Sequence, residues 1–266
     1  MNKPGSGKVA LITGSSRGLG RSFAERLATM GYDVGIHGLL ENEPAEYDDG
    51  TTVTNTAAEI AERFGVKAVS SLGDLTVKSE VVRVVQEVTD ALGPIDFLVD
   101  CAGGDTGAAG GKPKPNDSVM IKEADVRAVI ERNLLTTIFV CQEVAKGMIQ
   151  RGSGRIVTIG SQAVLVSPAE EAIYTSAKSA IVAYTRCLAT QLRPHGINVN
   201  CLAPGDTRTK RFLKTREIDP QRMVTEGTLE RIATLDEITR VIEFFAGPMG
   251  DFVSGQVLFV NGGHFI

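Results

Sequence analysis

The stretch that decides the fold is KVALITGSSRGLG, which runs from Lys8 to Gly20. Its first half is a short apolar run typical of a buried strand, and its second half is a glycine-rich turn. Phe23, Leu27 and Met30 then recur at helical spacing. Strand, glycine turn and helix in this order predict a backbone that can approach a pyrophosphate, with the helix N-terminus facing it. An ordinary strand-to-helix loop is the alternative interpretation.

The rest of the chain alternates between strand and helix patterns. Short apolar runs indicate further strands at 32–37, 66–71, 94–100, 155–160, 197–203 and 256–260. Stretches with helical spacing lie between them, at 51–64, 123–150, 174–192 and 234–246. A further helical stretch follows residue 76 and ends at about residue 92. This alternation predicts an α/β fold: a doubly wound parallel sheet of about seven strands with helices on both faces.

The composition favours one globular domain that binds a small molecule. A chain of 266 residues can bury a sizeable core within a single domain, here 1–266. The net charge of -4 gives no basic field for nucleic acid or for an anionic membrane. No apolar run has the length of a signal or membrane segment, which favours the cytoplasm. Scattered cysteines and histidines predict no metal site, and they predict buried free thiols at Cys101, Cys141, Cys187 and Cys201.

A serine, a tyrosine and a lysine lie at spacings that suit proton transfer. Ser161 follows the strand at 155–160, and Tyr174 and Lys178 lie four residues apart on one face of the next helix. An ammonium close to a phenol favours the phenolate, so such a tyrosine can donate or accept a proton near neutral pH. The same spacing also arises by chance on many helices. Asn133 is a poor helix former inside a helical stretch, which indicates a specific task.

Together these residues resemble the short-chain dehydrogenase/reductase family, in its single-domain Rossmann form, over nearly the whole chain. The family's glycine turn matches 13–20, and its Asn-Asn-Ala-Gly motif matches only at Ala102 and Gly103. Asp100 and Cys101 replace the two asparagines, which puts in doubt the usual hydrogen bonds that steady the central strand. The other matches, in order, are Asn133, Ser161, Tyr174, Lys178, Pro204, Gly205 and Thr209.

The resemblance implies a role for each member of the catalytic set. Tyr174 would be the general acid in carbonyl reduction and the general base in alcohol oxidation. Ser161 would hydrogen-bond the substrate oxygen, and Lys178 would favour the phenolate and hold the nicotinamide ribose. Asn133 would support a water that links Lys178 to solvent.

The resemblance also implies a set of cofactor contacts. Asp74 and Leu75 would border the adenine, although Asp74 could instead cap the helix that follows it. Thr207 and Thr209 would lie near the nicotinamide carboxamide or the pyrophosphate. The complete set is Gly14, Ser16, Arg17, Gly18, Leu19, Gly20, Asp74, Leu75, Ala102, Gly103, Tyr174, Lys178, Pro204, Gly205, Thr207 and Thr209.

The sequence favours NADP as the cofactor, with NAD as the alternative. Gly38 ends the second strand, where members of the family that prefer NAD place an acid, and Arg17 in the glycine turn could attract a 2′-phosphate. The residues directly after Gly38 do not include the arginine that members of the family that bind NADP often have there. Glu41 or Glu43 could fold back onto the ribose, but we expect the acidic stretch at 41–49 to be a solvated surface loop.

The predicted function is an NAD(P)-dependent oxidoreductase that acts on a secondary alcohol or ketone. A 3-oxoacyl-carrier-protein reductase should show a basic docking patch, whereas a sugar or polyol dehydrogenase should line its pocket with polar groups such as Asp105, Asp206 or His264. A non-catalytic nucleotide-binding regulator is the alternative from another class. The segment at 205–230 has the composition of a lid, and the irregular loop at 105–120 is either a substrate loop or a disordered excursion. Apolar helices at 123–150 and 174–192 suit a homotetramer.

Overall fold

Within residues 3–264, which the computed structural model describes, seven parallel strands form one sheet in the order β3-β2-β1-β4-β5-β6-β7. The order reverses between β1 and β4, so a crevice opens beyond the carboxyl ends of these two strands. The prediction of a doubly wound parallel sheet is confirmed. The strands are β1 (Val9–Thr13), β2 (Asp33–Gly38), β3 (Ala68–Leu72), β4 (Ile95–Asp100), β5 (Gly154–Ile159), β6 (Ile197–Pro204) and β7 (Val257–Val260).

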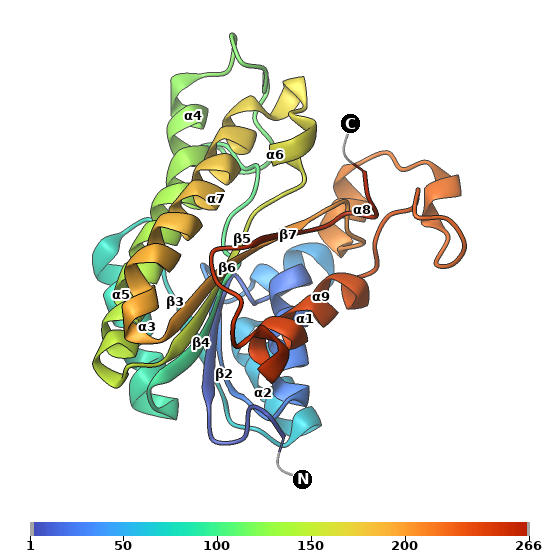
Figure 1. Cartoon of the computed structure of the whole chain (residues 1–266). Helices are drawn as coiled ribbons and strands as arrows, with labels where there is room; N and C mark the ends of the chain where they lie inside the picture. The colour runs from blue at the N-terminus through green and yellow to red at the C-terminus, as the bar shows by residue number, and fades with distance from the viewer. Residues whose placement is uncertain (1–2, 265–266) are drawn as a thin grey trace.

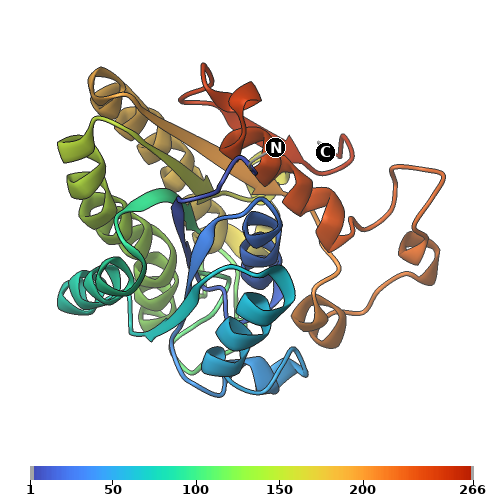
Figure 2. The ribbon, with the colours of Figure 1, turned by 90° about the horizontal axis from the view of Figure 1, so that it is seen from below.

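Helices cover both faces of the sheet (Figure 1). One layer consists of α1 (Gly18–Thr29), α2 (Val53–Phe64) and α9 (Leu235–Ala246). The other consists of α3 (Lys78–Leu92), α4 (Glu123–Ile130), α5 (Thr136–Arg151) and α7 (Ala172–Leu192). Figure 2 shows the sheet between the two layers and the 205–233 segment projecting from the body.

Each layer has its own hydrophobic core. Phe23, Leu27 and Ile36 are fully buried between the sheet and the α1 layer. Val84 and Met148 are buried to the same degree on the opposite side, under α3 and α5. All five residues of β1 are buried, as expected for a central parallel strand that is covered on both faces.

The predicted helix at 123–150 differs in detail. Its helical path is continuous, but a π-helical turn, η2 (Glu131–Leu135), separates α4 from α5. Asn133 lies in this turn, and its side chain bonds both to Val129 in α4 and to Gly104 in the loop after β4. A π-turn of this kind often marks a functional site, because it redirects one side chain without ending the helix.

The loops carry short elements that periodicity did not predict. The stretch after Ser161 contains α6 (Ala163–Val166) and η3 (Ala169–Glu171), and α7 begins at Ala172, so Tyr174 lies in its first turn. The 43–47 stretch forms η1 (Glu43–Tyr47). The projecting segment contains α8 (Lys210–Thr215) and η5 (Pro220–Met223). The remaining short turns are η4 (Arg193–His195) and η6 (Pro248–Gly250).

The cysteines are free, but they are not all buried. Cys141 and Cys201 lie in the core as expected, whereas Cys101 is partly exposed and Cys187 is exposed on α7. The buried-thiol prediction is therefore wrong for these last two residues. Within residues 3–264, no helix combines the length and the apolar character needed to cross a membrane.

Candidate active site

Tyr174 and Lys178 form one turn of α7 beside the carboxyl end of β5. Lys178 is only 4% exposed, and its Nζ donates a hydrogen bond to the carbonyl oxygen of Ile159 at 2.8 Å. The same Nζ lies 5.7 Å from the centroid of the Tyr174 ring. The end of β5 therefore fixes a buried ammonium next to the phenol, and the phenol itself keeps partial exposure.

Ser161 lies directly after β5, at the same edge of the sheet. Its Oγ accepts a hydrogen bond from the backbone N–H of Ala163 at 3.1 Å, which fixes the serine at the start of α6. Because α6 packs against α7, the serine and the tyrosine are held on neighbouring elements. Ser161, Tyr174 and Lys178 are thus gathered at one end of β5, as the sequence predicts.

Asn133 joins the π-turn to the loop after β4. Its Nδ2 donates to the carbonyl oxygens of Val129 at 2.8 Å and Gly104 at 2.9 Å, and its Oδ1 accepts from Gly104 N–H at 3.0 Å. A Cβ on Gly103 would lie 2.6 Å from that Oδ1, so this contact needs a glycine. The side chain, which is fully buried, orients the Gly103–Gly104 backbone.

Asp100 keeps the central strands joined although it replaces an asparagine. Thr13 Oγ1 donates to Asp100 Oδ1 at 2.8 Å and accepts from the N–H groups of Cys101 at 2.9 Å and Ala102 at 3.0 Å. Burial raises the pKa of the Asp100 carboxyl, and Thr13 and nearby Lys178 oppose that shift. The link between β1 and β4 that the sequence put in doubt is therefore present.

The glycine turn has the close packing that a dinucleotide site requires. Gly14 and Gly18 have φ values of +60° and +55°, which favour glycine. A Cβ on Gly20 would lie 2.2 Å from the carbonyl oxygen of Gly14, so α1 can approach the turn only at a glycine. The N–H of Gly18, at the α1 N-terminus, donates to the carboxylate of Asp49 at 2.5 Å. The Asp49 carboxylate thus lies where a pyrophosphate would bind, and the turn fits the cofactor.

His37 supports the glycine turn through its ring nitrogens, and it is not among the site residues predicted from sequence. Its Nδ1 accepts from Gly14 N–H at 3.1 Å, and its Nε2 lies 3.0 Å from the carbonyl oxygen of Gly73. Burial lowers the pKa of His37 to about 4. The imidazole is therefore neutral, with its proton on Nε2. A polar residue at the end of the apolar run 34–36 was the available signal.

The predicted adenine-side residues lie at the end of β3. Asp74 Oδ1 accepts hydrogen bonds from the N–H and hydroxyl of Thr76 at 3.0 and 2.7 Å. Because the residue before α3 is Val77, Asp74 does not cap that helix. Leu75 is buried in the core under α3.

The expectation of a solvated acidic loop is wrong for Glu43. Its carboxylate accepts a hydrogen bond from Ser16 in the glycine turn, since η1 folds back over the end of β2. Arg17 pairs with Glu46 in the same loop. Leu19, the next turn residue predicted at the cofactor, packs partly buried against the α1 core.

The segment after β6 reaches over the glycine turn. Thr207 Oγ1 donates to the carbonyl oxygen of Gly205, and Thr209 Oγ1 caps α8 by accepting from Phe212 N–H at 3.1 Å. The side chain of Thr209 would lie 3.8 Å from a Cβ on Gly18. The Pro204–Thr209 stretch and the glycine turn thus lie on opposite sides of the same crevice.

Charged side chains surround the substrate side of this crevice. Glu171, just before α7, lies 3.0 Å from Lys112 and 3.3 Å from Arg216. Asp206 lies 3.1 Å from Arg222. Under the 205–233 segment, a groove of about 810 Å³ is lined by polar groups that include Gln162, Asp206, Arg222, Asn261 and His264, and none of the four catalytic candidates lines it.

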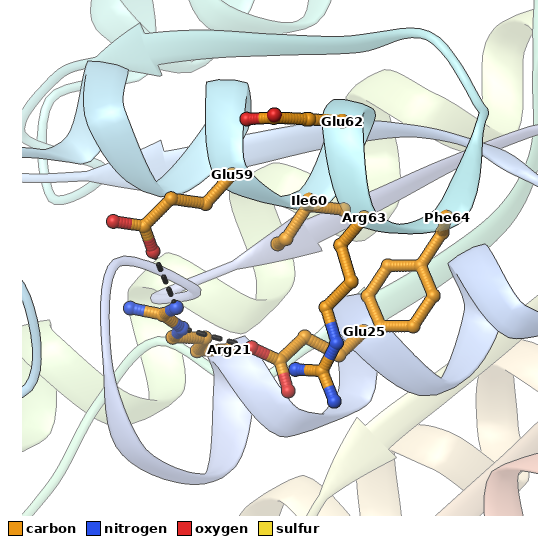
Figure 3. A pocket seen from close by; sticks show the side chains of 7 residues that line it. All are labelled: Arg21, Glu25, Glu59, Ile60, Glu62, Arg63 and Phe64. Atoms are coloured by element: carbon orange, nitrogen blue, oxygen red, sulfur yellow. Dashed lines mark hydrogen bonds and ion pairs between the residues drawn. The ribbon is translucent and has the colours of Figure 1, made fainter.

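A second hollow, of about 550 Å³, lies between α1 and α2 (Figure 3). Arg21 crosses it and pairs with Glu25 at 3.0 Å and Glu59 at 2.7 Å. None of the catalytic candidates lines this hollow. Its charges are used in packing one helix against the other.

Comparison with known proteins gives one consistent result. A family model described as short chain dehydrogenase matches residues 8–219. Cyclohexanol dehydrogenase of Rhodococcus sp. (strain TK6) is 34% identical over 98% of this chain and 97% of its own length. A 3-oxoacyl-(acyl-carrier-protein) reductase of Aquifex aeolicus is 30% identical over 97% of this chain and 98% of its own.

A solved structure shares the whole fold. A 7α-hydroxysteroid dehydrogenase, complexed with NADH and 7-oxoglycochenodeoxycholic acid, superposes with a TM-score of 0.82 at 29% identity, covering 98% of this chain and 96% of that one. The sheet order and the glycine turn define a dinucleotide-binding α/β protein. The chain belongs to the short-chain dehydrogenase family, and it is an NAD(P)-dependent oxidoreductase.

Proposed function

We propose that the protein interconverts a secondary alcohol and a ketone, with Tyr174 as the proton donor and acceptor. The observation that carries this proposal is the buried Lys178 ammonium, held between the carbonyl oxygen of Ile159 and the Tyr174 ring. A fixed positive charge stabilises the phenolate that forms when the tyrosine gives up its proton. The nicotinamide supplies or accepts the hydride when it is bound.

The other residues orient the reacting groups. Ser161 Oγ hydrogen-bonds the substrate oxygen, and Tyr174 Oη transfers a proton to or from that oxygen. Lys178 also holds the nicotinamide ribose, and Asn133 orients the Gly104 backbone through two hydrogen bonds. The pyrophosphate binds at the glycine turn and takes the place of the Asp49 carboxylate at the N–H of Gly18.

We further propose a small polar substrate. The groove lined by Gln162, the residue after Ser161, contains Asp206 and His264, two of the three groups expected of a sugar or polyol dehydrogenase. The third, Asp105, lies partly buried near Lys112, and burial raises the pKa of its carboxyl. A 3-oxoacyl-carrier-protein reductase is the second candidate, favoured by the Aquifex aeolicus relative.

The remaining proposals concern organisation. We propose one domain over 1–266 in which the 205–230 segment acts as a lid, because it lies opposite the glycine turn. A cytoplasmic location accords with the free cysteines of the described chain. Assembly as a homotetramer through the α4–α5 and α7 layer is a family-based proposal, and light scattering at micromolar concentration tests it.

The test of the mechanism is Tyr174→Phe. A panel of ketones and secondary alcohols, followed by the absorbance of the reduced nicotinamide, first identifies a substrate. On that substrate, we expect the variant to lose about 100-fold or more of kcat while dinucleotide binding is retained. Tyr184→Phe, on the same helix, is the matched control and should keep its activity. Near wild-type turnover by Tyr174→Phe would refute the assigned role.

A further inference from the structure

A negative charge lies at the end of β2, although the residue there is a glycine. Glu43 turns back from η1 so that its Oε2 accepts hydrogen bonds from Leu39 N–H at 3.0 Å and Ser16 Oγ at 3.1 Å. A Cβ on Gly38 would lie 3.0 Å from the same oxygen. Because Gly38 has no side chain, the Glu43 carboxylate can lie close to the end of β2.

No cation neutralises this carboxylate. Among the ion pairs of residues 3–264, Glu43 has no partner, and its Oε1 receives no hydrogen bond from any described residue. Arg17 is the cation of the glycine turn, but it pairs with Glu46 at 2.5 Å and donates to the backbone carbonyl of Glu43 at 3.0 Å. Its guanidinium also lies over the Tyr47 ring, 4.5 Å from the centroid. Arg17 thus holds the acidic loop in place.

The other end of the loop is also anchored. Arg21 donates to the carbonyl oxygen of Asp49 at 2.8 Å, and Figure 3 shows the same side chain reaching Glu25 and Glu59. Thr54 N–H, at the start of α2, donates to Glu41 at 3.1 Å. The position of Glu43 is therefore set by several contacts, and its carboxylate presents a fixed charge next to Ser16.

In a doubly wound dinucleotide-binding fold, the adenosine ribose lies beside the end of the second strand, and an acid there accepts hydrogen bonds from its hydroxyls. The Glu43 Oε1 is available to accept them. A 2′-phosphate at the same place would add about −1.5 to −2 charges next to an uncompensated carboxylate. Arg17, the cation of the glycine turn, is already paired with Glu46.

We propose that Glu43 selects the cofactor: it binds the adenosine ribose of NAD and excludes NADP. This inference rests on the proposed dinucleotide-dependent function, and it reverses the NADP preference that Gly38 and Arg17 suggest from sequence. The acid that contacts the ribose comes from η1, which follows β2. The residue at the end of β2 therefore does not reveal the preference for NAD over NADP.

The experiment measures the dissociation constants of NAD⁺ and NADP⁺ by calorimetry, without substrate. We expect the wild-type protein to bind NAD⁺ at least tenfold more tightly. Glu43→Gln removes the charge and keeps a hydrogen-bond acceptor for Leu39 and Ser16, so the loop should stay in place. The variant should narrow the NAD⁺/NADP⁺ ratio at least tenfold, about 1.4 kcal/mol, chiefly through tighter NADP⁺ binding. Glu41→Gln, the same charge change in the same loop, should leave the ratio within about twofold.

The outcomes separate this inference from the proposed function. Wild-type protein that binds NADP⁺ as tightly as NAD⁺, or equal effects of Glu43→Gln and Glu41→Gln, would overturn the role of Glu43 and leave the oxidoreductase intact. Binding of neither dinucleotide would instead overturn the proposed function. Binding of 5′-AMP against adenosine 2′,5′-bisphosphate should show the same preference, because both probes reach only the adenosine half of the site.

Discussion

At the scale of single residues, one hydroxyl joins the two strands at the point where the sheet order reverses. Thr13 Oγ1 donates a hydrogen bond to the Asp100 carboxyl, and it accepts hydrogen bonds from two successive backbone N–H groups. All of its bonding capacity is used in a buried place, where water cannot substitute for it. The end of β4 and the glycine turn after β1 are thereby kept together.

We expect Thr13→Val to destabilise the protein more than its small change in volume suggests. The substitution leaves a buried carboxyl without its donor and two N–H groups without their acceptor, which should cost about 2 to 4 kcal/mol. Thr13→Ser keeps the hydroxyl and loses one methyl group, so it should cost about 1 kcal/mol. Urea unfolding measures both, and equal losses would show that the hydroxyl is not the stabilising group.

At the scale of elements, two loop segments contact each other across the crevice. On α8, Lys214 lies 2.5 Å from Asp48, and Lys210 lies 3.7 Å from Asp49 and donates to the carbonyl oxygen of Asp48. Both lysines are half exposed, so each pair contributes little by itself. Together they connect the proposed lid to the loop that carries Glu43.

We expect the double variant Lys210→Gln/Lys214→Gln to release dinucleotide faster. Exposed ion pairs contribute up to about 1 kcal/mol each, so the dissociation rate should rise by roughly 2- to 10-fold. Stopped-flow measurements at low and high salt provide the test, because salt should accelerate release from the wild type more than from the variant. Lys146→Gln, which removes an exposed pair with Glu143 on α5, is the control. An unchanged dissociation rate in the double variant would show that these ion pairs do not retain the dinucleotide.

At the scale of the whole molecule, the sequence predicts the sheet and the place of the catalytic candidates because both depend on local patterns. Strand ends and helical spacing bring Ser161, Tyr174 and Lys178 to one edge of the sheet. The positions of Glu43 and His37 depend on contacts between segments distant in sequence, which periodicity does not encode. The same reason explains the π-turn at Asn133, whose partner Gly104 belongs to another loop.

His37 makes the stability of the whole molecule depend on pH, because it joins β2, the glycine turn and the end of β3 only when its ring is neutral. Its pKa is about 4 in the folded protein and 6.5 in the unfolded chain, so the unfolded chain binds the proton first as the pH falls. The contribution of His37 is therefore complete above pH 6.5, and up to about 3 kcal/mol is lost as the pH falls toward 4. Buried Asp100 opposes this trend, since its raised pKa favours the folded state at low pH.

Urea unfolding at a series of pH values should show a flatter dependence of the free energy of unfolding on pH for His37→Asn than for the wild type. His195→Asn, at an exposed position, should keep the wild-type slope, and a wild-type slope in His37→Asn as well would assign the pH dependence to other groups.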